Sequence, residues 1–365
     1  MTELLDKAAR IAIERIQHLT EVYEGQPEVS LHQHVRAKRR ARAITAKAFK
    51  LIYLDTNVWK CVADFQWGKT SLTDEMMHLG ATVERAMASG RFAFPIGAPT
   101  LLELDAMTDG TTRDSLNQVV DQMSRGFCIL PYTERLDTEL RQIRSNQFPE
   151  QEGLENFLCS PIELFGIPEV SSVGFWPDVD KLAFDKAMFD ALAEMPFSVL
   201  LDIGRDELGN KWDNSLSILE LNIGKAEHQA VVENLNTGIA IELRSLMSRW
   251  FAGQGIQMSL EDVNRYVLRA MQHWYANQDT KALATLRTLG STYGLMRFDQ
   301  QRKYHNGDPN DFMVAASALP AASALFTDRK LANLLADKRI KVASYSNCEV
   351  VSGFGEMARY LERHI

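Results

Sequence analysis

Short hydrophobic runs alternate with amphipathic segments along much of this chain. Runs with the length and apolar character of buried strands lie at 51–54, 92–96, 127–130, 324–326 and 340–343. Helical spacing of apolar residues predicts helices at 2–23, 114–124, 311–319 and 330–335. Strands that alternate with helices favour a parallel sheet covered on both faces. The fold class is therefore predicted to be α/β.

The middle of the chain has a different pattern. Few strand signals occur between 146 and 284, and helices are predicted at 182–194, 216–223, 226–235, 239–251 and 260–274. Ser259 and Asp262 resemble a capping box that opens the last of these. The predicted units are an N-terminal helix with a basic linker (1–47), two halves of an α/β core (48–145 and 285–365), and a helical insertion (146–284). By its position, the insertion is expected to govern access or partner choice.

Composition and charge narrow the class of protein. The chain has 365 residues, of which 45% are hydrophobic and 24% charged, as in globular proteins. No apolar run approaches the ~18 residues of a membrane helix, and the four cysteines are scattered without zinc-site spacing. We therefore expect a cytoplasmic protein with reduced thiols and no membrane segment. The net charge of −8 argues against an indiscriminate nucleic-acid binder.

One strongly basic segment precedes the first predicted strand. Residues 35–50 contain seven basic residues and no acidic ones. Such a run is either a solvated helix face or a contact to phosphates near an acidic pocket, and the sequence leaves both open. The helix at 2–23 can pack on the core or on a second subunit, so a homo-oligomer is also left open.

Four acidic residues stand on four separate hydrophobic signals. Asp55 and Asp328 each end a strand-like run, whereas Glu103 and Asp311 lie on predicted helices. Ligands of open α/β sheets bind at the carboxyl ends of the strands, where such acids would gather. Carboxylates in one pocket repel each other unless a cation neutralises them. The pattern therefore predicts a divalent-metal site and metal-assisted hydrolysis.

The neighbours of Asp55 and Glu103 in the sequence allow other interpretations than metal binding by these two acids. Asp55 precedes Thr56 and Asn57, which favour a turn or helix cap, so Asp55 can be a ligand or a simple cap. Asn57 can join a metal through water or act as a cap. Glu103 is surrounded by leucines, and its competitor is Asp105. We prefer Glu103 because its longer side chain reaches further from a helix.

The last two acids have polar neighbours as well. Asp308 and Asp311 share one helix start, where either can interact with the helix dipole and Asn310 can be the cap. That arrangement leaves Asp311 free to point outward. Asp328 follows Thr327 directly, which repeats the arrangement at Asp55.

Other enzyme classes lack their motifs. No glycine-rich turn follows the first strand, as a dinucleotide-binding protein requires, and no phosphate-binding loop with a Gly-Lys-Ser/Thr ending occurs. A phosphatase that forms an aspartyl-phosphate would need a second aspartate where Asn57 stands.

The ordered set of motifs resembles the PIN-domain nucleases. It consists of a strand followed by Asp55-Thr-Asn57, Glu103 on a helix, Asp311-Phe-Met-Val-Ala-Ala-Ser-Ala318, and Thr327-Asp328 after a strand. The resemblance covers roughly 48–140 and 285–350. Two features depart from the family pattern: Thr327 and Asp328 are adjacent, and compact family members lack a helical block of this size.

The resemblance implies a three-layer α/β/α core and cleavage of RNA with Mg²⁺ or Mn²⁺, leaving a 5′-phosphate and a 3′-hydroxyl. It assigns metal binding and catalysis to Asp55, Glu103, Asp311 and Asp328, with Asn57, Thr327 and Asp308 as accessory residues. A protein partner or inhibitor is left open. The alternative is a catalytically silent scaffold that binds RNA or a protein.

Overall fold

The computed structural model describes residues 2–149, 152–169, 180–204, 215–277 and 282–365. Its sheet contains β1 (Lys50–Leu54), β2 (Phe92–Ala93), β5 (Ala324–Thr327) and β6 (Glu349–Ser352) in the order β2-β1-β5-β6. All neighbouring strands are parallel. The prediction of an α/β fold with a parallel sheet is therefore confirmed. A smaller antiparallel pair joins β3 (Cys128–Ile129) to β4 (Leu158–Cys159).

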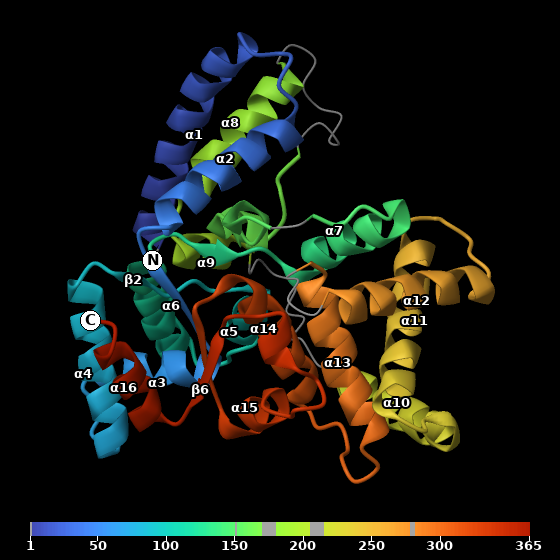
Figure 1. The fold of residues 1–365 in the computed structure, drawn as a ribbon. Coiled ribbons are helices and arrows are strands. Elements are labelled where there is room, and N and C mark those ends of the chain that lie inside the picture. The colour runs from blue at the N-terminus through green and yellow to red at the C-terminus, as the bar shows by residue number, and fades with distance from the viewer. Residues whose placement is uncertain (1, 150–151, 170–179, 205–214, 278–281) are drawn as a thin grey trace.

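Helices account for most of the remaining structure (Figure 1). They are α1 (Thr2–Glu24), α2 (Leu31–Ala46), α3 (Thr56–Gln66), α4 (Asp74–Ala88), α5 (Ala98–Asp105), α6 (Gly110–Ser124), α7 (Tyr132–Ser145), α8 (Lys181–Ala193), α9 (Phe197–Gly204), α10 (Ser215–His228), α11 (Leu235–Gly253), α12 (Leu260–Ala276), α13 (Ala284–Phe298), α14 (Asp308–Ala321), α15 (Arg329–Leu335) and α16 (Phe354–Glu362).

The two faces of the sheet pack into separate hydrophobic cores. Side chains alternate across a strand, so Ile52 and Leu54 enter one core while Leu51 and Tyr53 enter the other. The first core contains apolar residues of α3, α4, α6 and α16, and the second contains those of α7, α13, α14 and α15. The sheet is therefore a central layer with helices on both sides.

Three details of the predicted elements are wrong. Residues 340–343 do not form a strand: Val342–Ser344 is a 3-10 helix, and the edge strand is β6. Residues 226–235 are not one helix, because α10 ends at His228 and α11 begins at Leu235. Asn234 accepts the N–H of Thr237 and so starts a new helix. In addition, α14 begins at Asp308, three residues before its predicted start.

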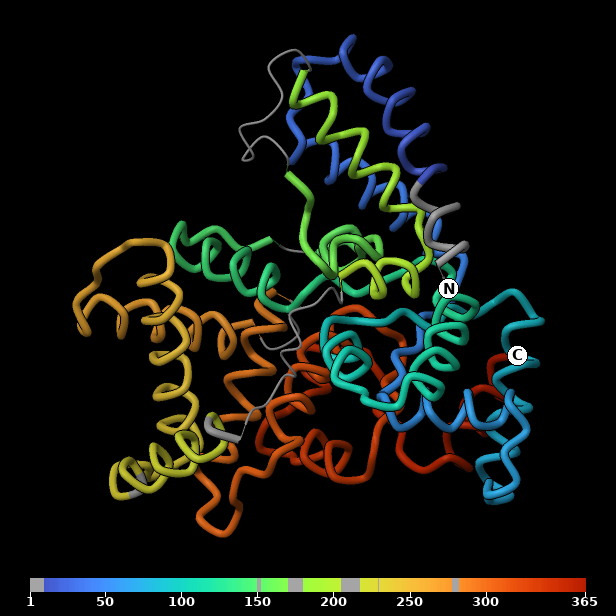
Figure 2. Tube along the Cα trace, turned by 180° about the vertical axis from the view of Figure 1, so that it is seen from behind, coloured from blue at the N-terminus to red at the C-terminus, as the bar shows by residue number. Residues whose placement is uncertain are grey.

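Two groups of helices extend the fold away from the sheet, and the second of them shares the core of α7 and α14. Figure 1 shows α1, α2 and α8 side by side at one end, and Figure 2 shows the same group from behind. The helices α11, α12 and α13 lie at another side, against α7. The stretch predicted as one insertion thus contributes helices to both groups. The helix α1 packs on α8 of its own chain.

A buried carboxylate joins the three helices of the first group. Asp190 of α8 lies 2.9 Å from His34 Nε2 and 2.6 Å from Lys38 Nζ, and it accepts the hydroxyl of Tyr23. Burial opposes its ionisation, but the hydrogen bonds from His34, Lys38 and Tyr23 outweigh burial and hold the pKa of Asp190 at about 2. This cluster explains why α1 and α2 dock on α8.

Among the described residues, no helix has the length and apolar character needed to cross a membrane.

Candidate functional site

The site lies at the carboxyl ends of β1 and β5, which are neighbours in the sheet. Leu54 is in register with Phe326, and the chain continues into Asp55 on one strand and into Thr327 and Asp328 on the other. The N–H of Asp55 donates to the Phe326 carbonyl over 2.9 Å, which extends the strand pairing by one residue. Strand pairing therefore brings together residues far apart in the sequence.

Asp55 occupies the N-cap position of α3 but does not cap it, since its side chain accepts no capping hydrogen bond. The Thr327 hydroxyl instead donates to Asp55 Oδ2 over 2.9 Å. Burial raises the pKa of Asp55, the Thr327 hydrogen bond and backbone N–H groups oppose that rise, and the charge of Asp328 adds to it. The carboxylate is thus held inside the site by a side chain of the neighbouring strand.

Glu103 reaches the site from α5 and has two polar partners. The side-chain amide of Asn310 donates to Glu103 Oε1, and the Thr56 side chain also hydrogen-bonds to this carboxylate. Burial raises the pKa of Glu103, the Thr56 hydrogen bond opposes the rise, and the charge of Asp55 adds to it. Asp105, the competing acid, is the last residue of α5.

The start of α14 places three polar side chains in one turn. Gly307 is the N-cap, so Asn310 is not the cap, and Pro309 lies in the first turn, where its missing N–H costs nothing. Asp308 is buried, accepts the N–H of His305 over 2.8 Å and pairs with Lys330.

Asp311 is the most strongly perturbed acid of the site. Burial and the charges of Asp328 and Asp55 raise the pKa of Asp311 to about 8, against a weaker opposing effect of Lys330. This side chain is half-buried one residue beyond Asn310. A protein without a compensating cation would therefore hold this group partly protonated at neutral pH.

Asp328 is the N-cap of α15, where its Oδ1 accepts the N–H of Leu331 over 2.8 Å. Its charge nevertheless acts on both Asp55 and Asp311. Thr327 and Asp328 are adjacent and both contribute to the site: Thr327 donates a hydrogen bond to Asp55, and Asp328 adds negative charge. Asn57 differs from these residues, since it is exposed in the first turn of α3.

Sequence reasoning missed two contributors, Thr56 and Asn310. Both lie next to an acid in the sequence, and both hydrogen-bond to Glu103, which belongs to a third element. Adjacency to an acid was the only signal in the sequence, and it does not reveal which acid is contacted.

The donor set suits a hard divalent cation. All four acids, together with the amide oxygen of Asn310, are oxygen donors of the kind that Mg²⁺ and Mn²⁺ prefer. Burial and neighbouring negative charges raise the pKa values of Asp55, Glu103 and Asp311. A bound cation would neutralise this negative charge. Within the described ranges, no three His, Cys, Asp or Glu side chains are already grouped to hold an ion. Binding would therefore draw the carboxylates closer together.

The basic run lies at the opposite edge of the sheet. The helix α2 leads into the first residue of β1, whereas the acids follow the last residues of β1 and β5. Two of its cations form ion pairs: Lys38 with Asp190, and Arg39 with Glu163 and Glu134. Of the two interpretations that the sequence leaves open, this position does not favour a contact to phosphates beside the acids.

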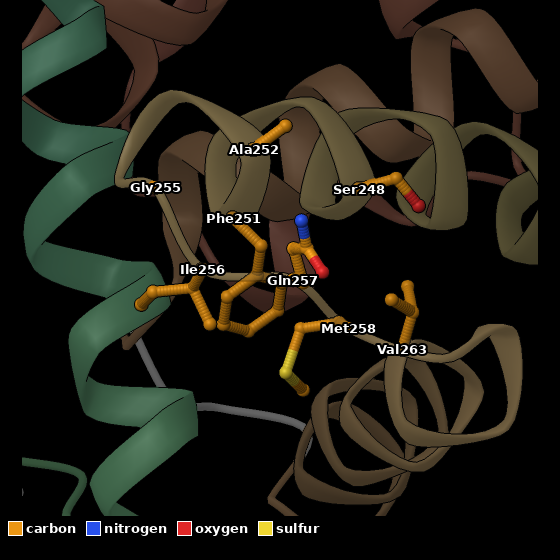
Figure 3. Close-up of a pocket in the computed structure, with 8 residues that line it drawn as sticks. All are labelled: Ser248, Phe251, Ala252, Gly255, Ile256, Gln257, Met258 and Val263. Carbon is orange, nitrogen blue, oxygen red and sulfur yellow. The ribbon is translucent and has the colours of Figure 1, made fainter.

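One well-defined pocket of the described residues has no acids in its wall. A cavity of about 600 Å³ lies between the end of α11 and the start of α12, and its lining includes Phe251, Ile256, Met258 and Val263 (Figure 3). None of its lining residues belongs to the elements that carry the four acids. The candidate site thus rests on side-chain chemistry and not on cavity size.

Comparisons of this chain with protein-family models, curated proteins and solved structures find no match.

Thr327→Val should weaken Mn²⁺ binding roughly 10-fold, since loss of a ligand-orienting hydrogen bond typically has this effect. Valine keeps the shape of threonine but cannot donate to Asp55. Titration calorimetry with Mn²⁺ measures the change. Thr292→Val is the matched control, because among the described residues the Thr292 hydroxyl bonds carbonyls of its own helix, those of Thr288 and Leu289. Equal Mn²⁺ affinity of Thr327→Val and the unmodified protein would contradict the assigned role.

Proposed function

We propose that this protein is a metal-dependent nuclease with a PIN-like core, which hydrolyses phosphodiester bonds in RNA. The observation that carries the proposal is the convergence of four acids at the carboxyl ends of two paired parallel strands: two directly follow β1 and β5, and the other two come from α5 and α14. The charges of these acids act on one another, as the raised pKa values of Asp55, Glu103 and Asp311 indicate. The layered sheet and the order of motifs along the chain also support it.

A bound Mg²⁺ or Mn²⁺ would supply Lewis acidity, which acidifies water and offsets charge on the phosphate. Asp55, Glu103, Asp311 and Asp328 would hold the ion. Thr327 orients Asp55, while Asn310 and Thr56 orient Glu103. These hydrogen bonds fix two of the carboxylates before substrate arrives, which lowers the cost of organising the site.

Two lysines near the acids are suited to bind substrate phosphates. Lys60 is exposed on α3 and its charge acts on Glu103. Lys330 lies in the first turn of α15, pairs with Asp308 and acts on the charge of Asp311. Cations beside a carboxylate site counter the repulsion between the acids and an incoming phosphate.

Lys60→Gln should weaken binding of single-stranded RNA and reduce its salt dependence. Loss of one phosphate contact lowers the slope of log affinity against log salt by about 0.7. The measurement is fluorescence anisotropy with catalytically silenced Asp55→Asn protein, between about 50 and 200 mM salt. Lys47→Gln is the matched control, because Lys47 is an exposed cation that follows α2 at the opposite edge of the sheet. Equal slopes for both variants would contradict a substrate contact of Lys60.

The chemistry of the products tests the proposed reaction. Labelled RNA and a DNA of the same sequence would be incubated with the protein and Mn²⁺, and the ends of the fragments identified. RNA fragments with a 5′-phosphate and a 3′-hydroxyl are expected from the resemblance to the PIN-domain nucleases. A 2′,3′-cyclic phosphate would show attack by the ribose hydroxyl and contradict the proposal. Preferential cleavage of DNA would overturn the assigned substrate but leave the reaction class intact.

A further inference from the structure

Asn310 has an unusual place in the acidic site. It is 4% exposed and lies in the first turn of α14, directly before Asp311. Its Nδ2 donates to Glu103 Oε1, which fixes the orientation of the amide, because an ionised carboxylate can only accept. The side chain therefore joins α14 to α5 inside the site.

The other end of this amide has no partner. Asn310 Oδ1 is buried, and no donor of the described part of the chain reaches it. A buried acceptor without a hydrogen bond is costly, and one that lies beside acids lacking a neutralising cation points to a group that binds there. An amide oxygen is a hard donor, and Asn side chains take part in the coordination of hard divalent cations together with carboxylates.

We propose that Asn310 is an additional ligand of the cation site, with its Oδ1 bound to the metal and its Nδ2 holding Glu103. The inference rests on the proposed function, because it assumes a cation among the four acids. One neutral donor beside the carboxylates adds a ligand without adding negative charge. It also connects the acid of α5 with the acid of α14, so that binding of the ion orders both elements.

Two substitutions test the roles of Asn310 Oδ1 and Nδ2 separately. Asn310→Leu keeps the approximate size but removes both polar atoms, whereas Asn310→Asp keeps an oxygen donor and loses the N–H that holds Glu103. Asn117→Leu is the matched control: Asn117 is also a buried asparagine with an unpartnered Oδ1, on α6, which carries none of the four acids. Each protein would be titrated with Mn²⁺ by calorimetry, and its melting temperature measured with EDTA and with Mn²⁺.

Asn310→Leu should raise the Mn²⁺ dissociation constant roughly 10- to 100-fold. In EDTA its melting temperature should change little, because leucine removes an unsatisfied acceptor but also the N–H bond to Glu103, and the two effects oppose each other. Asn310→Asp should melt lower in EDTA, since it adds a charge among the acids, yet keep its stabilisation by Mn²⁺. Asn117→Leu should bind Mn²⁺ like the unmodified protein.

Two results would overturn the inference in distinguishable ways. If the unmodified protein and Asn310→Leu bind Mn²⁺ equally, Asn310 is not a ligand, while the proposed nuclease function is untouched. If the unmodified protein binds no Mn²⁺, the inference and the proposed metal-dependent function fail together. Loss of Mn²⁺ binding in Asn310→Leu, without RNA cleavage by the unmodified protein, would support the ligand and contradict the nuclease.

Discussion

Asp311→Asn is expected to abolish metal-dependent cleavage while stabilising the metal-free protein above neutral pH. Loss of one carboxylate ligand should lower the rate at least about 100-fold. The metal ion, which offsets the charge on the phosphate, would be held less firmly. The stabilising effect follows from burial and from the charges of Asp328 and Asp55, which raise the pKa of Asp311 to about 8. Asparagine fits the same space without the charge.

The sign of the pH dependence follows from this raised pKa. A carboxyl group whose pKa is higher in the folded chain binds its proton more tightly when folded. Its contribution to the free energy of unfolding is complete below the ordinary aspartate pKa and is lost as the pH rises to about 8. In EDTA, Asp311→Asn should therefore be more stable than the unmodified protein at alkaline pH, by roughly 2–5 kcal/mol once solvent screening of this half-buried group is included.

Urea unfolding in EDTA across this pH range measures the effect. Asp337→Asn is a control of opposite sign, since a hydrogen bond from Arg339 lowers the pKa of Asp337 and its charged form stabilises the fold. That variant should lose a little stability at neutral pH. A loss of stability in Asp311→Asn at every pH would contradict this prediction. It would show that the carboxylate stabilises the fold and that its charge does not destabilise it.

Glu139→Ala is expected to give the largest loss of stability, about 3–5 kcal/mol, since it breaks a buried ion pair. Glu139 of α7 is fully buried and accepts the N–H groups of Thr285 and Leu286 over 3.1 and 2.7 Å, at the start of α13. It also lies 3.2 Å from the guanidinium of Arg135. Alanine would leave two helix N–H groups and part of a buried cation without partners.

Urea or thermal unfolding measures this loss. Glu134→Ala, one turn earlier on α7, is the matched control, because Glu134 is 40% exposed where it pairs with Arg39. Arg39 is largely buried but keeps its second partner, Glu163, so the loss of Glu134 should cost about 1 kcal/mol or less. Similar losses in the two variants would contradict the assigned importance of the buried cap.

The sequence predicted the central part of the fold because its signals are local. The runs that became β1 and β5 are continuous and apolar, and each ends in an acid, so strand ends and candidate ligands were found together. The edge strand β6 was missed because most of it is not buried, which leaves only a weak hydrophobic pattern. Ile340 and Val342 were assigned to a strand instead, although they are core residues around a 3-10 helix.

The rest of the site depends on contacts that no local pattern encodes. Thr327 and Asp55 meet only because β1 and β5 pair in one register. Asn310 and Thr56 meet Glu103 only because α14 and α3 pack near α5. The basic run shows the converse: it lies close to Asp55 in the sequence, yet strand direction puts it at the other edge of the sheet.

Cleavage of a mixed pool of single-stranded and structured RNA tests the central claim most directly. The purified protein would be compared with Asp55→Asn, each with Mn²⁺ and with EDTA, alongside Asn57→Asp as a variant of an exposed neighbour. We predict cleavage only by proteins that keep Asp55, and only with Mn²⁺. Cleavage that persists in EDTA or in Asp55→Asn would contradict the account, and so would an intact pool with a protein that binds no Mn²⁺.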